Sequence, residues 1–257
     1  MLTLYHNDMS VCAQKVRLAL AEKGLAYEPR HLNLRAGDQQ KPDYLKLNAK
    51  GVVPTLVHDA IVVTESIVIN EYIEDAFPAT PLRPADPAGR AKMRLWTKEI
   101  DGGIFAATGI VSMSVAFHHQ YPPEVVEDLT RLRGPAYRQR FEQLRKGVDN
   151  PAFPDAIRRL NKMVLDMSAA LERAPWLVGD AFTLADIAYA PYVTRLDHLK
   201  FLGLLDRNPR VGDWYERMCA RPAYQSALAA QFNPKYLPLM AEKGSEAWPR
   251  VRALLEL

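Results

Sequence analysis

The sequence has little that would stabilise a secreted protein or anchor a membrane protein. Only two cysteines, Cys12 and Cys219, occur among 257 residues, and they lie far apart in the chain. Two cysteines cannot form the disulfide framework of a small secreted domain, and no Cys/His cluster has zinc-site spacing. No apolar run approaches the roughly 18 residues of a membrane span, and the N-terminus turns polar at once. We therefore expect a cytoplasmic protein without a bound metal or a membrane partner.

An excess of one charge is also missing. The 33 Lys and Arg residues against 30 Asp and Glu residues leave a formal net charge of +3. The charges are mixed along the chain, so they give no basis for a nucleic-acid partner. The chain is 48% hydrophobic and 25% charged, which is typical of a globular protein. Its length allows one large domain or two small ones.

Strand and helix signals alternate over the first 78 residues. Lys23-Gly24 is a stop signal for the first helix, and Thr64 is a plausible N-cap of the last. The order βαβ, α, ββα is that of a thioredoxin-like domain. In chain order, we expect a strand at 2–5, a helix at 11–23, a strand at 27–34, a weak helix at 39–47, a hairpin of strands at 52–57 and 60–63 that turns at His58-Asp59, and a helix after Thr64.

Proline then breaks the pattern, and only helical patterns follow. Four prolines between residues 78 and 87 predict a stiff linker at residues 79–87. An all-helical domain is expected over residues 88–257. Its expected helices are at 88–117, at 125–148 as one helix or a pair, at 157–173, at 183–201 and at 211–221.

The first candidate for chemistry is the junction of the first strand with its helix. The N–H groups in the first turn of a helix are unpaired and carry partial positive charge, which would stabilise a thiolate there. Ser10 could donate its hydroxyl to such a thiolate, and Cys12 could itself be the activated thiol. In the alternative interpretation, Ser10 only caps the helix and Cys12 is a buried apolar side chain.

The second candidate is Val53-Pro54 together with Glu65-Ser66. A cis bond before Pro54 would expose the backbone N–H and C=O of Val53 to a peptide-like ligand. Glu65 and Ser66 place a carboxylate and a hydroxyl beside free N–H groups, which suits the amine and carboxylate of a γ-glutamyl group. In the alternative interpretation, this segment is an ordinary helix cap with an acidic first turn.

In combination, these motifs resemble the cytosolic glutathione transferases, of the serine/cysteine type found in bacteria. The resemblance implies a thioredoxin-like α/β domain at residues 1–78 and an all-α helical bundle domain at residues 88–257. It also implies glutathione as cosubstrate and a homodimer. The matching residues are Leu4-Tyr5, Ser10, 15–17, Asn48, Gly51, 53–56 and Glu65-Ser66, with 176–180 and the structural capping box at 182–186.

The resemblance also implies a role for each matching residue. Ser10 would hydrogen-bond the glutathione sulfur, the backbone of Val53 would pair with the cysteinyl part, and Pro54 would be the family's cis-proline. Glu65 and Ser66 would hold the γ-glutamyl end. Three further residues are candidates for binding the glycine carboxylate, because Val52 stands where many members have Lys, Arg or Gln. These are Gln39, Lys41 and Lys50.

Two branches of this family leave the reaction open. Residues 4–12 resemble the reductive dehalogenase for chlorinated hydroquinones, in which a cysteine at the position of Cys12 forms a mixed disulfide with glutathione. Residues 82–87 resemble the bacterial lignin β-etherases. We expect a glutathione S-transferase whose activated thiol attacks a hydrophobic, aromatic electrophile. The alternatives are a glutathione-dependent reductase, dehalogenase or β-etherase, and a glutathione-binding protein without turnover.

Apolar and aromatic side chains near the start of the helical domain are candidates for the electrophile pocket, which we expect between the domains. Such residues at helical spacing more often belong to a core, so the core interpretation stays open. The last of the set could polarise a carbonyl or ether oxygen, or simply end a helix. The candidates are Trp96, Ile100, Phe105, Met113, Phe117 and His118.

Overall fold

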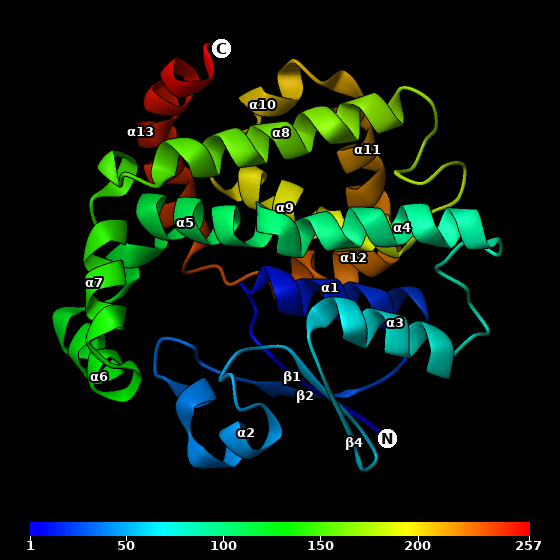
Figure 1. Ribbon diagram of the computed structural model, residues 1–257, viewed down its shortest axis with the longest axis horizontal. Helices are drawn as coiled ribbons and strands as arrows, with labels where there is room; N and C mark the ends of the chain where they lie inside the picture. The colour runs from blue at the N-terminus through cyan, green and yellow to red at the C-terminus, as the bar shows by residue number, and fades with distance from the viewer. The chain divides into compact units, whose positions relative to one another are not determined.

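The computed structural model describes residues 1–257 and contains one four-stranded sheet among many helices (Figure 1). The order of strands in the sheet is β2-β1-β3-β4. The central strand β1 runs parallel to β2 and antiparallel to β3, and β3 and β4 form a hairpin. This is the predicted thioredoxin-like sheet. The strands are β1 (Leu2–His6), β2 (Glu28–His31), β3 (Thr55–His58) and β4 (Ile61–Thr64).

Two helices, α1 (Val11–Glu22) and α3 (Ser66–Ala76), lie side by side on one face of this sheet (Figure 1). A short helix, α2 (Pro42–Leu47), follows the 3-10 turn η1 (Asp38–Gln40). The helices bury apolar side chains against alternate residues of β1, as period-two strands require. The core consists of Leu2, Leu4, Val16, Leu20, Leu56, Ile69 and Ile73.

Three boundaries differ from the sequence prediction. Thr64 does not cap α3, because it still pairs with Thr55 in the hairpin, and Glu65 precedes the helix instead. The hairpin turns one residue later than expected, because His58 pairs with Ile61. The second strand is shorter than expected, because its partner β1 ends at His6.

The helix expected over residues 88–117 is broken in two. It forms α4 (Pro87–Glu99) and α5 (Phe105–Val115), and a π-helical turn, η2 (Ile100–Ile104), lies between them. Gly103 has φ 134°, which is not helical, and a 3-10 turn, η3 (Phe117–Gln120), follows α5. A single helix was therefore the wrong prediction, and the non-helical backbone of Gly103 in η2 is the physical reason.

The remaining helices include several that the sequence patterns did not reveal. Gly134, with φ 84°, separates the expected helix pair α6 and α7. No helix of the chain combines the length and apolar composition needed to cross a membrane. The elements are α6 (Pro123–Arg133), α7 (Pro135–Leu144), η4 (Gly147–Asp149), α8 (Phe153–Leu171), α9 (Leu184–His198), α10 (Gly203–Asp206), α11 (Pro209–Ala220), α12 (Pro222–Ala227), η5 (Ala229–Gln231) and α13 (Leu237–Leu255).

The chain folds into two compact units, each made of three segments. The first unit comprises residues 1–97, 174–191 and 214–233, and the second comprises residues 98–173, 192–213 and 234–257. In the first unit, which contains the sheet, α12 packs against α1. The second unit contains the neighbouring helices α5 and α8. These units are not continuous in sequence, and the domains expected at residues 1–78 and 88–257 stay a prediction.

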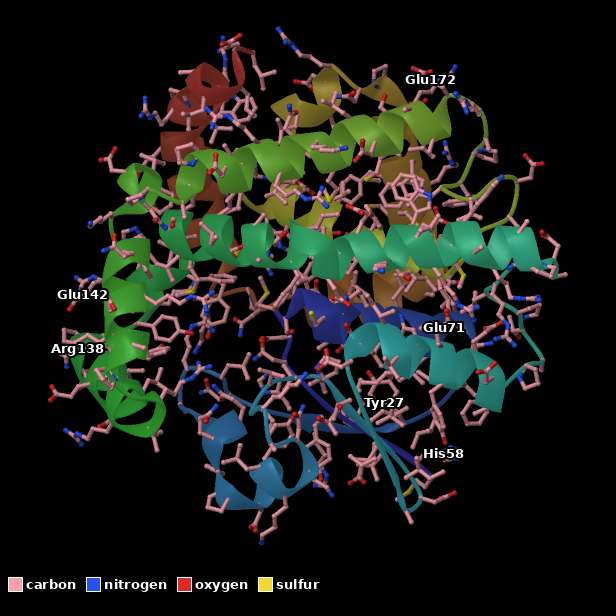
Figure 2. The ribbon with its side chains drawn as sticks, viewed as in Figure 1. Tyr27, His58, Glu71, Arg138, Glu142 and Glu172 are labelled. Atoms are coloured by element: carbon pink, nitrogen blue, oxygen red, sulfur yellow. The ribbon has the colours of Figure 1, made fainter.

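Within the first unit, a buried ion pair fixes the proline-rich segment after α3. Lys23 Nζ lies 2.7 Å from Glu74 Oε2, and both side chains are at least 98% buried. Lys23 also donates to the carbonyls of Phe77 and Thr80, and Glu74 accepts the N–H of Leu82. Removal of one partner from a buried pair typically costs about 3–5 kcal/mol. Nearby, Arg94 of α4 pairs with Glu71 of α3 at 3.0 Å, and Glu71 is labelled in Figure 2.

Candidate active site

Ser10 stands between β1 and α1, as the sequence predicts. Its Oγ accepts the N–H of Ala13 at 3.3 Å, so the capping interpretation is confirmed. A serine hydroxyl has one donor hydrogen and two acceptor lone pairs. The cap uses only an acceptor position, so the hydrogen can still be donated to a sulfur. Capping and thiol activation are therefore compatible roles for Ser10.

Cys12 is the second residue of α1. It is a free thiol and is partly exposed, so its interpretation as a buried apolar side chain is wrong. The first turn of a helix favours a thiolate, because its N–H groups and the helix dipole carry partial positive charge. Ser10 and Cys12 thus lie at the start of the same helix, and the role of each toward a sulfur stays a prediction.

A buried arginine holds the loop that carries Ser10. Arg17 of α1 has no exposed surface and donates to the backbone carbonyls of Asn7 at 2.9 Å and Asp8 at 3.2 Å. It also donates to Ala227 of α12 at 2.9 Å. Burial lowers the pKa of Arg17 to about 10, so it remains a cation at neutral pH. The sequence predicts Arg17 only as part of a family motif and carries no signal for this role.

His6 and Asp8 complete the support of this loop. His6 Nδ1 lies 3.3 Å from Arg17 Nη1, and burial together with the charge of Arg17 lowers the pKa of His6 to about 4. The imidazole is therefore neutral at physiological pH and can accept from the guanidinium. Asp8 accepts the N–H of Met9 and the side-chain amide of Asn233, both at 2.8 Å. The loop between β1 and α1 is thus connected to Arg17 and to Asn233 of the first unit.

The Val53–Pro54 peptide bond is cis, as expected. The turn before it depends on Gly51, which has φ +59°. A Cβ at this position would be strained at this φ, and it would lie 3.0 Å from the carbonyl of Gln39 and displace the side-chain amide of Gln40. The carbonyl of Val52 accepts hydrogen bonds from the side chains of Tyr44 and Asn48, which fix the loop before Pro54.

Glu65 and Ser66 stand together at the start of α3. Glu65 has φ 66° and ψ 112°, a conformation that residues with a Cβ seldom adopt, and Ser66 is buried. Lys50 Nζ lies 2.6 Å from Glu65 Oε1. This hydrogen bond raises the pKa of Lys50. Lys50 is thus next to the residue predicted for the γ-glutamyl end, whereas its expected position was toward the glycine end.

The other two glycine-end candidates are held by nearby groups. Gln39 is buried in η1, where its Nε2 donates to the carbonyl of Leu34 at 3.1 Å. Lys41 pairs with Asp38 at 2.7 Å, and the hydrogen bond from Lys41 lowers the pKa of Asp38. Both residues lie between β2 and the loop that leads to Pro54. Their role toward a ligand stays a prediction.

The candidates for the electrophile pocket are divided between the two compact units. Trp96 belongs to the first unit, where its ring contacts Tyr189 edge to face at 5.2 Å. In the second unit, Ile100 is fully buried and Phe105 is 51% exposed. His118 Nδ1 lies 2.8 Å from the carbonyl of Met113. Phe117 packs under the Arg195 guanidinium at 4.8 Å. Ile100 is therefore a core residue, and the pocket remains a prediction.

The second motif of the helical region is structural, as predicted. Asp186 in the first turn of α9 is completely buried, and this burial raises its pKa. Its carboxylate accepts the N–H groups of Leu177 and Thr183, both at 3.0 Å, and Trp214 Nε1 at 2.9 Å. Thr183 Oγ1 in turn accepts the N–H of Ala185. This is the capping arrangement that the spacing of Thr183 and Asp186 indicates.

Comparison with known proteins identifies the family. The family models for the N-terminal and C-terminal domains of glutathione S-transferase match residues 1–75 and 150–217. Protein LigF from Sphingobium sp. (strain NBRC 103272 / SYK-6) is 31% identical over 255 residues, which cover 94% of this chain and 98% of LigF. The chain belongs to the glutathione S-transferase family. The protein is thus a glutathione-dependent enzyme with glutathione as its cosubstrate.

Three further comparisons agree with membership in the glutathione S-transferase family. The crystal structure of beta-etherase LigF from Sphingobium sp. strain SYK-6 matches with a TM-score of 0.78 at 29% identity, over 88% of this chain and 98% of that chain. Glutathione S-transferase 3 from Zea mays is 32% identical over 89% of this chain and 94% of its own. Tetrachloro-p-hydroquinone reductive dehalogenase from Sphingobium chlorophenolicum is 28% identical over 88% of this chain and 94% of its own.

Proposed function

We propose that this glutathione S-transferase uses the Ser10 hydroxyl to activate the thiol of glutathione for attack on a hydrophobic, aromatic electrophile. The observation that supports this proposal most directly is the cap geometry of Ser10, which uses an acceptor position and leaves the hydroxyl hydrogen for the sulfur. The fixed loop before Ser10 keeps this donor in place. The cysteinyl part of glutathione would lie at Val53, and its γ-glutamyl end at Glu65 and Ser66.

The energy required for activation matches what this arrangement can supply. A thiol with a pKa of about 8.5 is only a few per cent ionised at neutral pH. Lowering the pKa by two units requires about 2.7 kcal/mol of preferential stabilisation of the thiolate. A hydrogen bond to a charged group contributes about 1.5–3 kcal/mol, and a helix N-terminus adds about 0.3–1 kcal/mol.

The proposed reaction is a displacement at an electrophilic carbon. The glutathione thiolate forms a C–S bond while the bond from that carbon to its leaving group breaks. The leaving group takes the electron pair and departs as a halide or a phenolate. The names of two relatives, a beta-etherase and a reductive dehalogenase of a chlorinated hydroquinone, support an aromatic ether or a halogenated aromatic as substrate.

A second candidate function is suggested by the partly exposed Cys12 thiol. Its thiolate would attack the sulfur of an aryl–glutathione adduct and form a mixed disulfide, while the aryl carbon takes the bonding electrons and a proton. A second glutathione would then release oxidised glutathione and restore the Cys12 thiolate. The net result is reductive replacement of a halogen by hydrogen, with two glutathione molecules as the reductant.

Two variants test these functions. Ser10→Ala should lower kcat/KM near pH 6.5 by about 10- to 100-fold, because the pKa of the bound thiol rises by up to two units. Activity with aryl halides, aryl ethers and chlorohydroquinones would be measured over a range of pH. Unchanged turnover in Ser10→Ala would reject Ser10 as the activator.

Cys12→Ser should leave conjugation intact, and a Cys12 without a glutathione adduct after treatment with oxidised glutathione would reject the reductive function.

We further propose that the protein acts as a homodimer in the cytoplasm. The resemblance of the whole chain to glutathione S-transferases supports this state, because dimers are typical of the family. Light scattering of the purified protein measures the assembly directly. A mass equal to that of one chain at micromolar concentration would contradict the dimer.

A further inference from the structure

A closed ring of hydrogen bonds lies beneath the loop that ends at Pro54. Tyr44 Oη donates to the carbonyl of Val52 at 2.5 Å, and Asn48 Nδ2 donates to the same carbonyl at 2.9 Å. Thr55 Oγ1 lies 2.9 Å from Tyr44 Oη and 3.1 Å from Asn48 Nδ2. All three side chains are at least 95% buried. Burial of these three side chains favours the bonds within the ring over bonds to water.

The hydrogens of this ring can be assigned without ambiguity. Tyr44 has one hydroxyl hydrogen and gives it to Val52, so the Thr55 hydroxyl donates to Tyr44 Oη. The two amide hydrogens of Asn48 go to Val52 and Thr55. The Asn48 amide cannot be reversed, because its Oδ1 accepts the N–H of Lys50 at 3.1 Å. Burial raises the pKa of Tyr44, so its hydroxyl keeps its hydrogen at physiological pH.

The ring determines where the N–H of Val53 points. The carbonyl of Val52 and the N–H of Val53 belong to the same planar, trans peptide unit, in which they point in opposite directions. Two donors, Tyr44 and Asn48, hold that carbonyl toward the interior. The N–H of Val53 therefore points away from Tyr44, out of the ring. Removal of the Tyr44 hydroxyl would release one of the two restraints on this peptide.

We propose that Tyr44 is a positioning residue for glutathione. Its hydroxyl fixes the Val52–Val53 peptide and so aims the N–H of Val53 at the cysteinyl carbonyl of glutathione. This inference rests on the proposed function, in which the Val53 backbone binds glutathione. The hydroxyl can be separated from the packing of the ring, because the Tyr44 ring also contacts Tyr5 at 5.5 Å and a phenylalanine would retain that contact.

The test compares Tyr44→Phe with Tyr72→Phe. Tyr72 is the matched control, because its hydroxyl bonds His58 Nδ1 at 2.8 Å, at the far end of the same hairpin. Calorimetric titration with reduced glutathione gives Kd, and steady-state kinetics give KM and kcat. Tyr44→Phe should raise Kd and KM for glutathione about 3- to 10-fold, the range expected for one hydrogen bond. We expect kcat and the KM of the electrophile to change less than about twofold, since the bond acts on ground-state binding.

The outcomes separate this inference from the proposed function. If the wild-type protein gives no binding with glutathione, the proposed function and the Tyr44 inference both fail. If the wild type binds and Tyr44→Phe has the same Kd, only the Tyr44 inference fails. An equal rise of Kd in Tyr72→Phe would indicate general destabilisation and overturn the positioning role.

A truncated ligand locates the effect within glutathione. γ-Glutamylcysteine amide has no glycine carboxylate but keeps, as an amide, the cysteinyl carbonyl that Val53 would bind. Tyr44→Phe should weaken its binding by the same factor as for glutathione. A loss confined to glutathione would place the effect at the glycine end and contradict the proposed role of Tyr44.

Discussion

At the scale of the residue, Glu65 has the most unusual backbone conformation of the candidate site. Its φ of 66° and ψ of 112° lie outside the regions that residues with a Cβ prefer. Such a conformation costs about 1–3 kcal/mol and persists only where the surrounding structure requires it. The proposed need for a carboxylate beside Ser66 explains why a glycine does not occupy this position.

Glu65→Gly should therefore stabilise the fold and impair ligand binding. Relief of the backbone strain exceeds the entropic cost of glycine, so we expect the free energy of unfolding to rise by about 1 kcal/mol. Glutathione affinity should fall at least about tenfold with the loss of a charged partner. Urea unfolding and calorimetric titration measure the two effects.

Glu142→Gly is the matched control, at an exposed helical position in α7 that Figure 2 labels. It should lose about 1 kcal/mol of stability, because glycine is a poor helix former. A Glu65→Gly protein that is destabilised as much as Glu142→Gly would show that Glu65 stores no strain.

Single residues also show where the sequence was informative. Ser10, Pro54 and Asp186 could be predicted because each has a local signal: a cap, a strand start or a fixed spacing. Arg17 could not, because a charged residue in a helix is expected at the surface. Its burial depends on backbone carbonyls that come together only in the folded unit, including that of Ala227.

At the scale of the element, the break between α4 and α5 depends on one glycine. Gly103 has φ 134°, and a Cβ there would lie 3.3 Å from Arg159 Nε. Arg159 is itself fixed by Glu99 at 2.6 Å. The π-helical turn therefore requires a residue without a side chain at position 103.

Gly103→Ala should lower the free energy of unfolding by about 1–3 kcal/mol, because alanine is strained at this φ. Gly109→Ala in the helix α5 is the control, since a Cβ there meets no atom within 4 Å. It should be stabilising by about 0.5–1 kcal/mol. Thermal and urea unfolding of both variants would check these signs. Stabilisation by Gly103→Ala would mean that the turn can relax into a regular helix.

The elements that the sequence predicted are those with strong local signals. The Lys23-Gly24 stop signal predicts α1, and the β-branched residues of the hairpin predict β3 and β4, with only small differences in the end residues. By contrast, α13 was not predicted, because two of its four buried positions, Gly244 and Ala247, carry small residues rather than large apolar ones. At Gly244 a Cβ would lie 1.9 Å from the carbonyl of Leu199, so close packing replaces the apolar pattern there.

At the scale of the whole molecule, each compact unit contains a histidine whose pKa is lowered by burial, His6 buried and His198 partly buried. Burial lowers the pKa of His6 to about 4 in the first unit and that of His198 to about 3 in the second. An unfolded histidine has a pKa of about 6.5. Between these values the unfolded chain binds protons that the folded chain does not. Stability from both groups is therefore present above pH 6.5 and is lost as the pH falls toward 4.

We expect each histidine to remove about 2 kcal/mol from the free energy of unfolding between pH 7 and pH 5. Urea unfolding of the wild type and of His6→Gln at both pH values measures the share of His6. Subtracting the pH dependence of one protein from that of the other removes the contribution of the carboxylates, because these titrate in both proteins. A His6→Gln protein with the same pH dependence as the wild type would contradict a neutral, buried His6.

The contact between Arg17 and Ala227 affects when the protein can fold during its own synthesis. These two residues are separated by 210 positions in the chain. At about 5–20 residues per second, a ribosome needs on the order of 10–40 s to make that intervening stretch. Until α12 emerges, the Arg17 guanidinium lacks one of its carbonyl acceptors. The first unit therefore begins with the first residues to be translated but is complete only when α12 has been made. A nascent chain that stalls before α12 would leave α1 accessible to chaperones and proteases.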